Sequence, residues 1–170
     1  MRVSLPFGLT FPLLVGLLMF SAATEAYAQG GSASSPVQRA QDHASSALTY
    51  LSTWDGRDCL SEPINNARYA LARLSGLLSA TGASATNPGL SSVERTIYLR
   101  RYGQMADMQI STQLEIADAY LQHNCIDDAD KLYRDIVSDF PGSRYEAARQ
   151  RAQIGIDDVR ERRRSSEAPS

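Results

Sequence analysis

The chain of 170 residues lacks the short motifs that mark most enzyme active sites. It has no glycine-rich phosphate loop, nucleophile elbow, paired-carboxylate site or Cys-x-x-Cys-His sequence for attaching haem. Histidine is scarce as well, and His43, which follows Asp42 in an alanine-rich stretch, is typical of a helix surface rather than of a catalytic base. We therefore predict a protein that is not an enzyme and that needs no cofactor.

A strong excess of charge is also missing, because 17 basic residues face 19 acidic ones and the formal net charge is -2. A balanced chain gives no general reason to expect nucleic acid as a partner. Basic residues gather near the end, in the stretch from Arg160 to Arg164. We interpret residues 161–170 as a disordered basic tail at a frayed helix end, and the alternative is an electrostatic contact with an anionic envelope surface.

The sequence also lacks a clear metal-binding motif. His123, Cys125, Asp127 and Asp128 lie close together and carry ligand-type atoms. Metal sites with such a mixture usually need further ligands at defined spacing, and a turn between two helices explains all four residues. We predict no metal site.

A long apolar run is absent. The apolar stretch from Leu9 to Phe20 is shorter than the roughly 20 residues that a bilayer span needs, and Pro12 and Gly16 interrupt it. No stable membrane span is therefore expected in the mature protein.

The same stretch fits a signal peptide. Arg2 precedes the apolar core, and Ala26-Tyr27-Ala28 supplies the small-x-small pattern that a signal peptidase cuts. We predict a signal peptide over residues 1–28 and a flexible linker over residues 29–35. The mature protein is expected to be periplasmic or secreted.

Cysteine is scarce, with Cys59 and Cys125 the only two. In an oxidising compartment such a pair favours a disulfide. The alternative is two buried thiols packed as small apolar groups.

Alternation with the period of a β-strand is absent, whereas apolar residues recur at helical spacing. One stripe follows Pro36 and ends at about Trp54, and a second follows Ser61 and ends near Gly82. These stripes predict an antiparallel helical hairpin, followed by a loop of small residues over residues 80–90.

Serines mark the expected helix starts. A capping box, in which a serine and a Gln or Glu three residues later bond each other's backbone, is predicted at Ser35, Ser91 and Ser143. The box at Ser91 opens a long helix that reaches about His123, where Asn124 suits a left-handed turn.

The stretch DDADKLYRDIVSDFPGS, residues 127–143, predicts a helix with an enforced end. Its apolar positions fall on one face, and Asp130 is expected among the charged residues that face water. Pro141 pushes Phe140 out of the helical region, and Gly142 permits a reversal into the next helix. The fold class is therefore all-α, with about five helices in antiparallel hairpins.

The segment from Ile110 to Val159 resembles a tetratricopeptide repeat (TPR). The resemblance rests on the spacing of Ala117, Tyr120, Ala129, Tyr133 and Pro141. The DFPGSRY ending is similar to the form found in envelope proteins such as the BamD-like assembly lipoproteins and the periplasmic cell-division coordinator. The resemblance implies a TPR-like right-handed helical stack over residues 36–160.

Such repeats expose the first helix of each pair on a concave face, where a peptide or a partner helix binds. The matching positions here are Leu114, Asp118, Leu121 and Gln122, extended upstream by Arg100 and Arg101. The resemblance thus implies an exported adaptor or scaffold that binds another envelope protein or peptide through a helical groove. Leu114 and Leu121 are also open to interpretation as core residues.

A second hypothesis is a small-ligand-binding helical bundle that acts as a periplasmic sensor. Its cavity would lie between the first two helices and be lined by Leu51, Trp54, Leu71 and Leu74. An open groove along the third helix favours the adaptor, whereas an enclosed pocket beside Trp54 favours the bundle.

Overall fold

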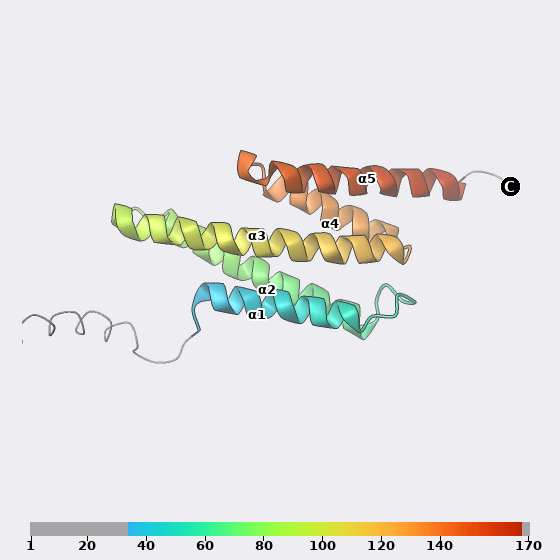
Figure 1. The fold of residues 1–170 in the computed structure, drawn as a ribbon, viewed down its shortest axis with the longest axis horizontal. Helices are drawn as coiled ribbons and strands as arrows, with labels where there is room; N and C mark the ends of the chain where they lie inside the picture. Colours follow the sequence, from blue (N-terminus) through green and yellow to red (C-terminus); the bar gives the residue numbers. More distant parts are fainter. Residues whose placement is uncertain (1–33, 168–170) are drawn as a thin grey trace, which may run out of the picture. The chain divides into compact units, whose positions relative to one another are not determined.

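The structure, a computed structural model, describes residues 34–167, and all regular structure in that range is helical. The elements are α1 (Pro36–Ser52), α2 (Glu62–Ala85), α3 (Ser92–Gln122), α4 (Ile126–Asp139), the 3-10 turn η1 (Ser143–Tyr145) and α5 (Glu146–Glu167) (Figure 1). The predicted all-α class is confirmed. The predicted signal peptide over residues 1–28 and most of the predicted linker over residues 29–35 lie outside the described residues.

Each helix packs against the next helix in the sequence, and α3 also packs against α1 and α5. α1 contacts α2 and α3, α3 also contacts α2, α4 and α5, and α4 contacts α5. The backbones of α2 and α4 stay apart from each other. In Figure 1, α1, α3 and α5 lie in front while α2 and α4 lie behind, so the helices form two layers.

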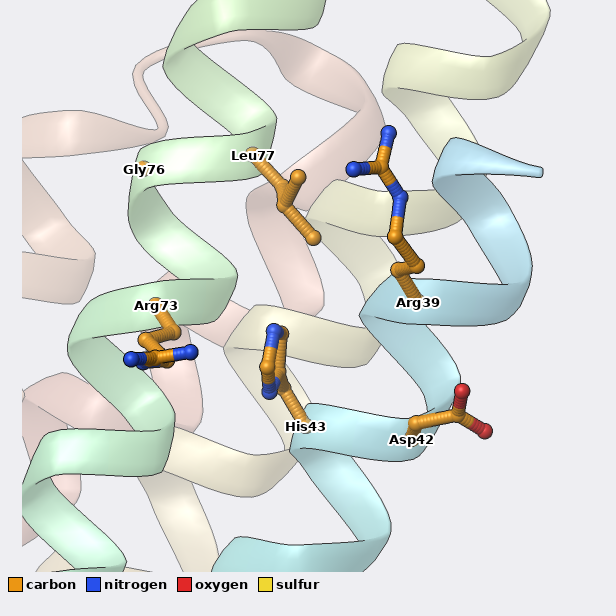
Figure 2. Close-up of a pocket in the computed structure, with 6 residues that line it drawn as sticks. All are labelled: Arg39, Asp42, His43, Arg73, Gly76 and Leu77. Carbon is orange, nitrogen blue, oxygen red and sulfur yellow. The ribbon is translucent and has the colours of Figure 1, made fainter. Parts of the chain in front are cut away.

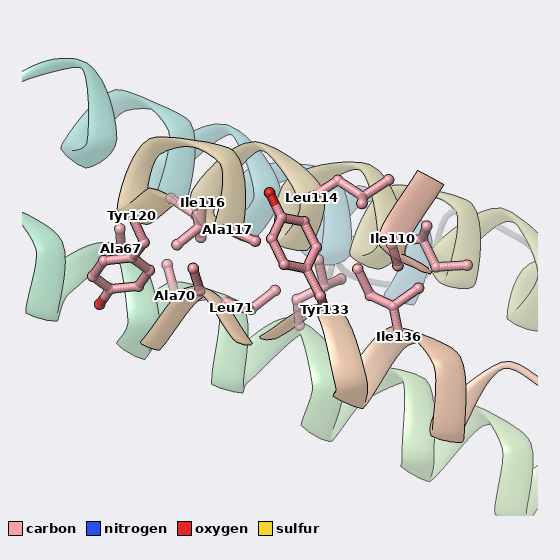
Figure 3. Packing of buried hydrophobic residues seen from close by; sticks show 14 of the residues in the cluster. Ala67, Ala70, Leu71, Ile110, Leu114, Ile116, Ala117, Tyr120, Tyr133 and Ile136 are labelled. Carbon is pink, nitrogen blue, oxygen red and sulfur yellow. The ribbon is translucent and has the colours of Figure 1, made fainter. Parts of the chain in front are cut away.

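A continuous apolar core runs through all five helices. The predicted stripes supply it, and its fully buried members include Ile64 and Leu74 of α2, Ile116 and Tyr120 of α3, Tyr133 and Ile136 of α4, and Val159 of α5. Figure 3 shows side chains of α2, α3 and α4 that meet in this core. Because every helix contributes a buried stripe, the stack holds together by shared apolar burial rather than by helix propensity.

Two of the three predicted helix starts have the expected serine contact. The Ser35 hydroxyl accepts a hydrogen bond from the backbone N–H of Gln38 (3.1 Å), but the predicted box is incomplete, because the Gln38 side chain donates to Asp42 instead (3.1 Å). At Ser91 the capping box is complete, because the Glu94 carboxylate also accepts from the Ser91 N–H (2.9 Å). These bonds from Ser91 hold the pKa of Glu94 below its usual value.

The capping box predicted at Ser143 is wrong. Ser143 is the first residue of η1, and α5 begins at Glu146. The Glu146 carboxylate does not return to Ser143, since it accepts hydrogen bonds from Arg149 and Gln150 within its own helix. The two side chains one turn along α5 compete successfully for that carboxylate.

Cys59 and Cys125 form a disulfide, with their Cα atoms 5.8 Å apart. It joins the loop between α1 and α2 to the turn between α3 and α4. The predicted pairing of the two cysteines is confirmed. The bond is compatible with an oxidising, extracytoplasmic compartment.

Packing around this bond fixes the two connections against each other. The Trp54 ring makes edge contacts with the rings of Tyr120 and His123, at centroid distances of 5.6 and 4.9 Å. Gly56 has a φ of 74°, and His123 lies so close that a Cβ there would sit 1.7 Å from its Nδ1. Asn124, with a φ of 63°, takes the left-handed turn conformation that the sequence predicts.

Two helices are longer than their sequences predict. α2 continues through Ala85, where a loop was expected from residue 80, because Thr81 and Ala85 are buried. α5 runs through Glu167, so residues 161–167 are helical where the sequence predicts a disordered tail. In both cases tertiary contacts outweigh a composition that favours a loop.

The arginines of the predicted tail explain the second difference. Arg162 donates to the backbone carbonyl of Leu121 (2.6 Å), and Arg163 pairs with Asp127 (2.7 Å) and Asp130 (3.1 Å). Asp130 is therefore buried rather than turned to water, and it also pairs with Arg134 at 2.9 Å. A buried carboxylate with two guanidinium partners avoids the cost of an unpaired charge.

Candidate functional site

A hollow of about 260 Å³ opens between α3 and α5. Three of the six residues predicted to bind a partner line it: Asp118, Leu121 and Gln122 of α3. Tyr133 of α4 forms part of its wall, and α5 contributes Arg151, Ile154, Gly155, Asp158 and Arg162. The predicted position along the third helix thus coincides with a real depression of the surface.

A glycine lets α5 approach α4 at the base of this hollow. A Cβ added to Gly155 would lie 2.4 Å from Cζ of the buried Tyr133 ring, so only glycine leaves room for the ring here. The Tyr133 hydroxyl donates to Asp118 (2.5 Å). Burial raises the pKa of Tyr133, and the bond to the Asp118 carboxylate raises it further. Tyr133 therefore stays a neutral donor.

Asp118 is committed to contacts within the protein. One carboxylate oxygen accepts from Tyr133, and the other accepts from Arg151 of α5 (2.6 Å). The side chain thereby ties α3 to α4 and α5 at once. Its role is to position the walls of the hollow, and its carboxylate has little left to offer a partner.

The two predicted leucines are core residues. Leu114 is 4% exposed and does not line the hollow, whereas Leu121 is 7% exposed and forms part of its floor. Of the predicted residues, only Gln122 presents an exposed side chain to the hollow. Ile154, which no sequence pattern singles out, is 63% exposed at the opposite wall.

Arg100 and Arg101 lie away from this site. Both belong to the first half of α3, and neither lines the hollow between α3 and α5. Arg100 is exposed, and the Arg101 guanidinium lies 6.0 Å from the ring centroid of Tyr98. Of the six predicted residues, three therefore line the hollow, Leu114 lies in the core, and Arg100 and Arg101 lie elsewhere on α3.

The residues proposed to line a ligand cavity between the first two helices are packed instead. Leu74 is fully buried, Leu71 nearly so, and Trp54 is covered by Tyr120 and His123. A shallow hollow of about 500 Å³ does lie between α1 and α2, but other residues line it: Arg39, Asp42, His43, Arg73, Gly76 and Leu77 (Figure 2). It is open to solvent and includes two arginines and an aspartate, unlike the enclosed apolar interior that small-molecule pockets usually have.

Within residues 34–167, no three His, Cys, Asp or Glu side chains are grouped so that they could hold a metal ion. Over the same residues, no helix combines the length and hydrophobicity needed to cross a membrane. Comparison of the chain with family models, with curated proteins and with solved structures gives no match.

Proposed function

We propose that the protein is an exported adaptor with TPR-like helical pairs, which binds another envelope protein or peptide in the hollow between α3 and α5. The observation that carries the proposal is the coincidence of two independent features. The residues that the repeat resemblance places on a binding face, Asp118, Leu121 and Gln122, line an open hollow. The order of helix contacts, each on its neighbour with α3 bridging to α1 and α5, is the order expected of stacked helical pairs.

The chemistry of the hollow suits a side chain rather than a reaction. Ile154 and Leu121 supply apolar surface, while Gln122 and Asp158 supply polar groups at the edge. Interfaces of this kind have an apolar anchor at the centre and a polar rim around it. A partner that inserts one apolar side chain against Ile154 would use both.

The walls of the hollow are held in place before any partner arrives. Asp118 links Tyr133 and Arg151, and Arg162 donates to the carbonyl of Leu121. A surface that is already ordered loses less conformational entropy on binding, which favours affinity. The disulfide between Cys59 and Cys125 supports export, because such bonds persist in oxidising compartments.

Position-specific photocrosslinking in the native host tests the proposal. A photoreactive residue at Gln122 or Ile154 is expected to give one discrete protein adduct, while the same residue at exposed Gln41 of α1 serves as the control. Ile154→Asp, in a chain that carries the photoreactive residue at Gln122, should abolish the adduct without altering the melting temperature. Equal adducts from all three positions, or an adduct that survives Ile154→Asp, would argue against this surface.

A further inference from the structure

The first three turns of α3 form a tip with little support from the rest of the protein. We call residues 91–102 the α3 tip. None of them is buried, and the buried residues of α3 begin at Gly103. In Figure 1 this end of α3 extends beyond the neighbouring ends of α1, α4 and α5. The tip is therefore open to solvent over most of its circumference.

Large apolar side chains are concentrated on this tip. Val93 is 68% exposed, Ile97 is 42% exposed and Leu99 is 54% exposed. Single exposed apolar residues are ordinary, but three within two turns of one helix are a local concentration of apolar surface that a helix in water gains nothing by displaying. This concentration indicates that the helix end is covered in at least one state of the protein.

The tip is also basic, in a chain that is acidic overall. Residues 91–102 contain three arginines and one carboxylate, that of Glu94, which the capping box occupies. Arg95, Arg100 and Arg101 form no ion pair with any described residue. The tip therefore presents three arginines that no described carboxylate neutralises, whereas Arg160 and Arg163 near the end of the chain are paired with aspartates.

The distribution of these side chains around the helix narrows the choice of partner. Val93 and Ile97 are four residues apart and share a face, whereas Leu99 lies about 200° around the axis from Ile97 at about 100° per residue. A partner groove would contact one stripe of a helix. Apolar and basic side chains that surround a helix end suit a fluid interface, where arginines keep their charge at the headgroups while their stems lie alongside apolar neighbours.

We propose that the α3 tip binds the surface of an anionic lipid bilayer, with Val93, Ile97 and Leu99 in the headgroup region and Arg95, Arg100 and Arg101 at lipid phosphates. Helical segments with basic and apolar side chains bind such interfaces reversibly, without spanning the membrane. Each arginine near an anionic surface adds about fivefold to the partition coefficient. This surface is separate from the hollow between α3 and α5, so the two proposals stand or fall independently.

Vesicle flotation with the exported chain tests the proposal. Two probes are used, vesicles of phosphatidylcholine alone and vesicles that also contain phosphatidylglycerol. The chain is expected to float with the phosphatidylglycerol vesicles at least about tenfold better than with the neutral ones. Raising the salt concentration should release it. Equal binding to both vesicles, or binding to neither, would overturn the proposal.

Two variants and a matched control locate the contact. Arg100→Glu with Arg101→Glu should lower flotation at least about tenfold, and Val93→Ser with Ile97→Ser should lower it as well. Arg57→Glu with Arg164→Glu changes the net charge equally at other exposed positions and should bind as the parent does. Melting temperatures are expected to stay close to that of the parent, since no residue of the tip is buried.

The same variants distinguish the other occupants. A dimer in analytical ultracentrifugation that Val93→Ser with Ile97→Ser disrupts, in a chain that does not float, would assign the tip to a second copy and refute the lipid contact. Loss of a crosslinked acidic protein on Arg100→Glu with Arg101→Glu, again without flotation, would assign it to a protein partner and refute it equally.

Discussion

Replacing Gly155 by alanine sets two opposing effects of known size against each other. In a helix interior, alanine is more favourable than glycine by about 1 kcal/mol. At Gly155, however, the added Cβ would lie 2.4 Å from Cζ and 2.5 Å from a Cε of the buried Tyr133 ring. Overpacking a well-filled core costs about 1 to 3 kcal/mol. The ring cannot move without stretching the hydrogen bond that the Tyr133 hydroxyl donates to Asp118. Weakening this bond lowers the free energy of unfolding further.

We therefore expect Gly155→Ala to lower the free energy of unfolding by about 1 to 2 kcal/mol. Gly76 of α2 supplies the matched control, because no atom of the described part of the chain crowds a Cβ built there within 4 Å. Gly76→Ala should raise the free energy of unfolding by about 1 kcal/mol. Urea unfolding followed by circular dichroism measures both. If Gly155→Ala is as stabilising as Gly76→Ala, then the close approach of α5 to Tyr133, and the wall of the hollow it creates, is refuted.

Three further predictions concern stability. Cys59→Ala with Cys125→Ala should lower the free energy of unfolding by about 4 kcal/mol, because the bond closes a loop of 66 residues; reductant should destabilise the parent equally and leave the variant unchanged. Gln109→Leu should raise the free energy of unfolding by about 1 kcal/mol, since the buried amide oxygen of Gln109 has no hydrogen-bond partner among residues 34–167. Gln113→Leu is its control and should be destabilising, because Gln113 donates to the Leu132 carbonyl. Ser91→Ala should cost about 1 kcal/mol at neutral pH. The folded-state pKa of Glu94 is lowered, so its contribution is present above its unfolded pKa and lost as pH falls, and the deficit of Ser91→Ala should narrow in acid.

The helices and the disulfide follow from local and compositional signals. Apolar spacing placed α3 and α4 to within a few residues, because helix packing needs a stripe that recurs each turn. With only two cysteines in the chain, Cys59 and Cys125 could form just one pair, and the expected oxidising compartment favoured the disulfide over two free thiols. The left-handed turn at Asn124 and the capping box at Ser91 could be predicted because both depend only on residues within a few positions along the chain.

The contacts between helices could not be read in the same way. Nothing near Asp118 in sequence announces that Tyr133 and Arg151 will share its carboxylate, since those partners are 15 and 33 residues away. Asp130 has a charge pattern typical of a solvated face, and its burial depends on Arg163, 33 residues away. Gly155 illustrates the same limit, because a glycine within a helix signals close approach only when the facing side chain is known.

Amide hydrogen exchange of the chain with the partner identified by crosslinking tests the adaptor proposal most directly. We expect binding to slow exchange in the second half of α3 and in the middle of α5, the two walls of the hollow, and to leave exchange in α1 and α2 unchanged. Protection confined to α1 and α2, or to the α3 tip alone, would contradict it.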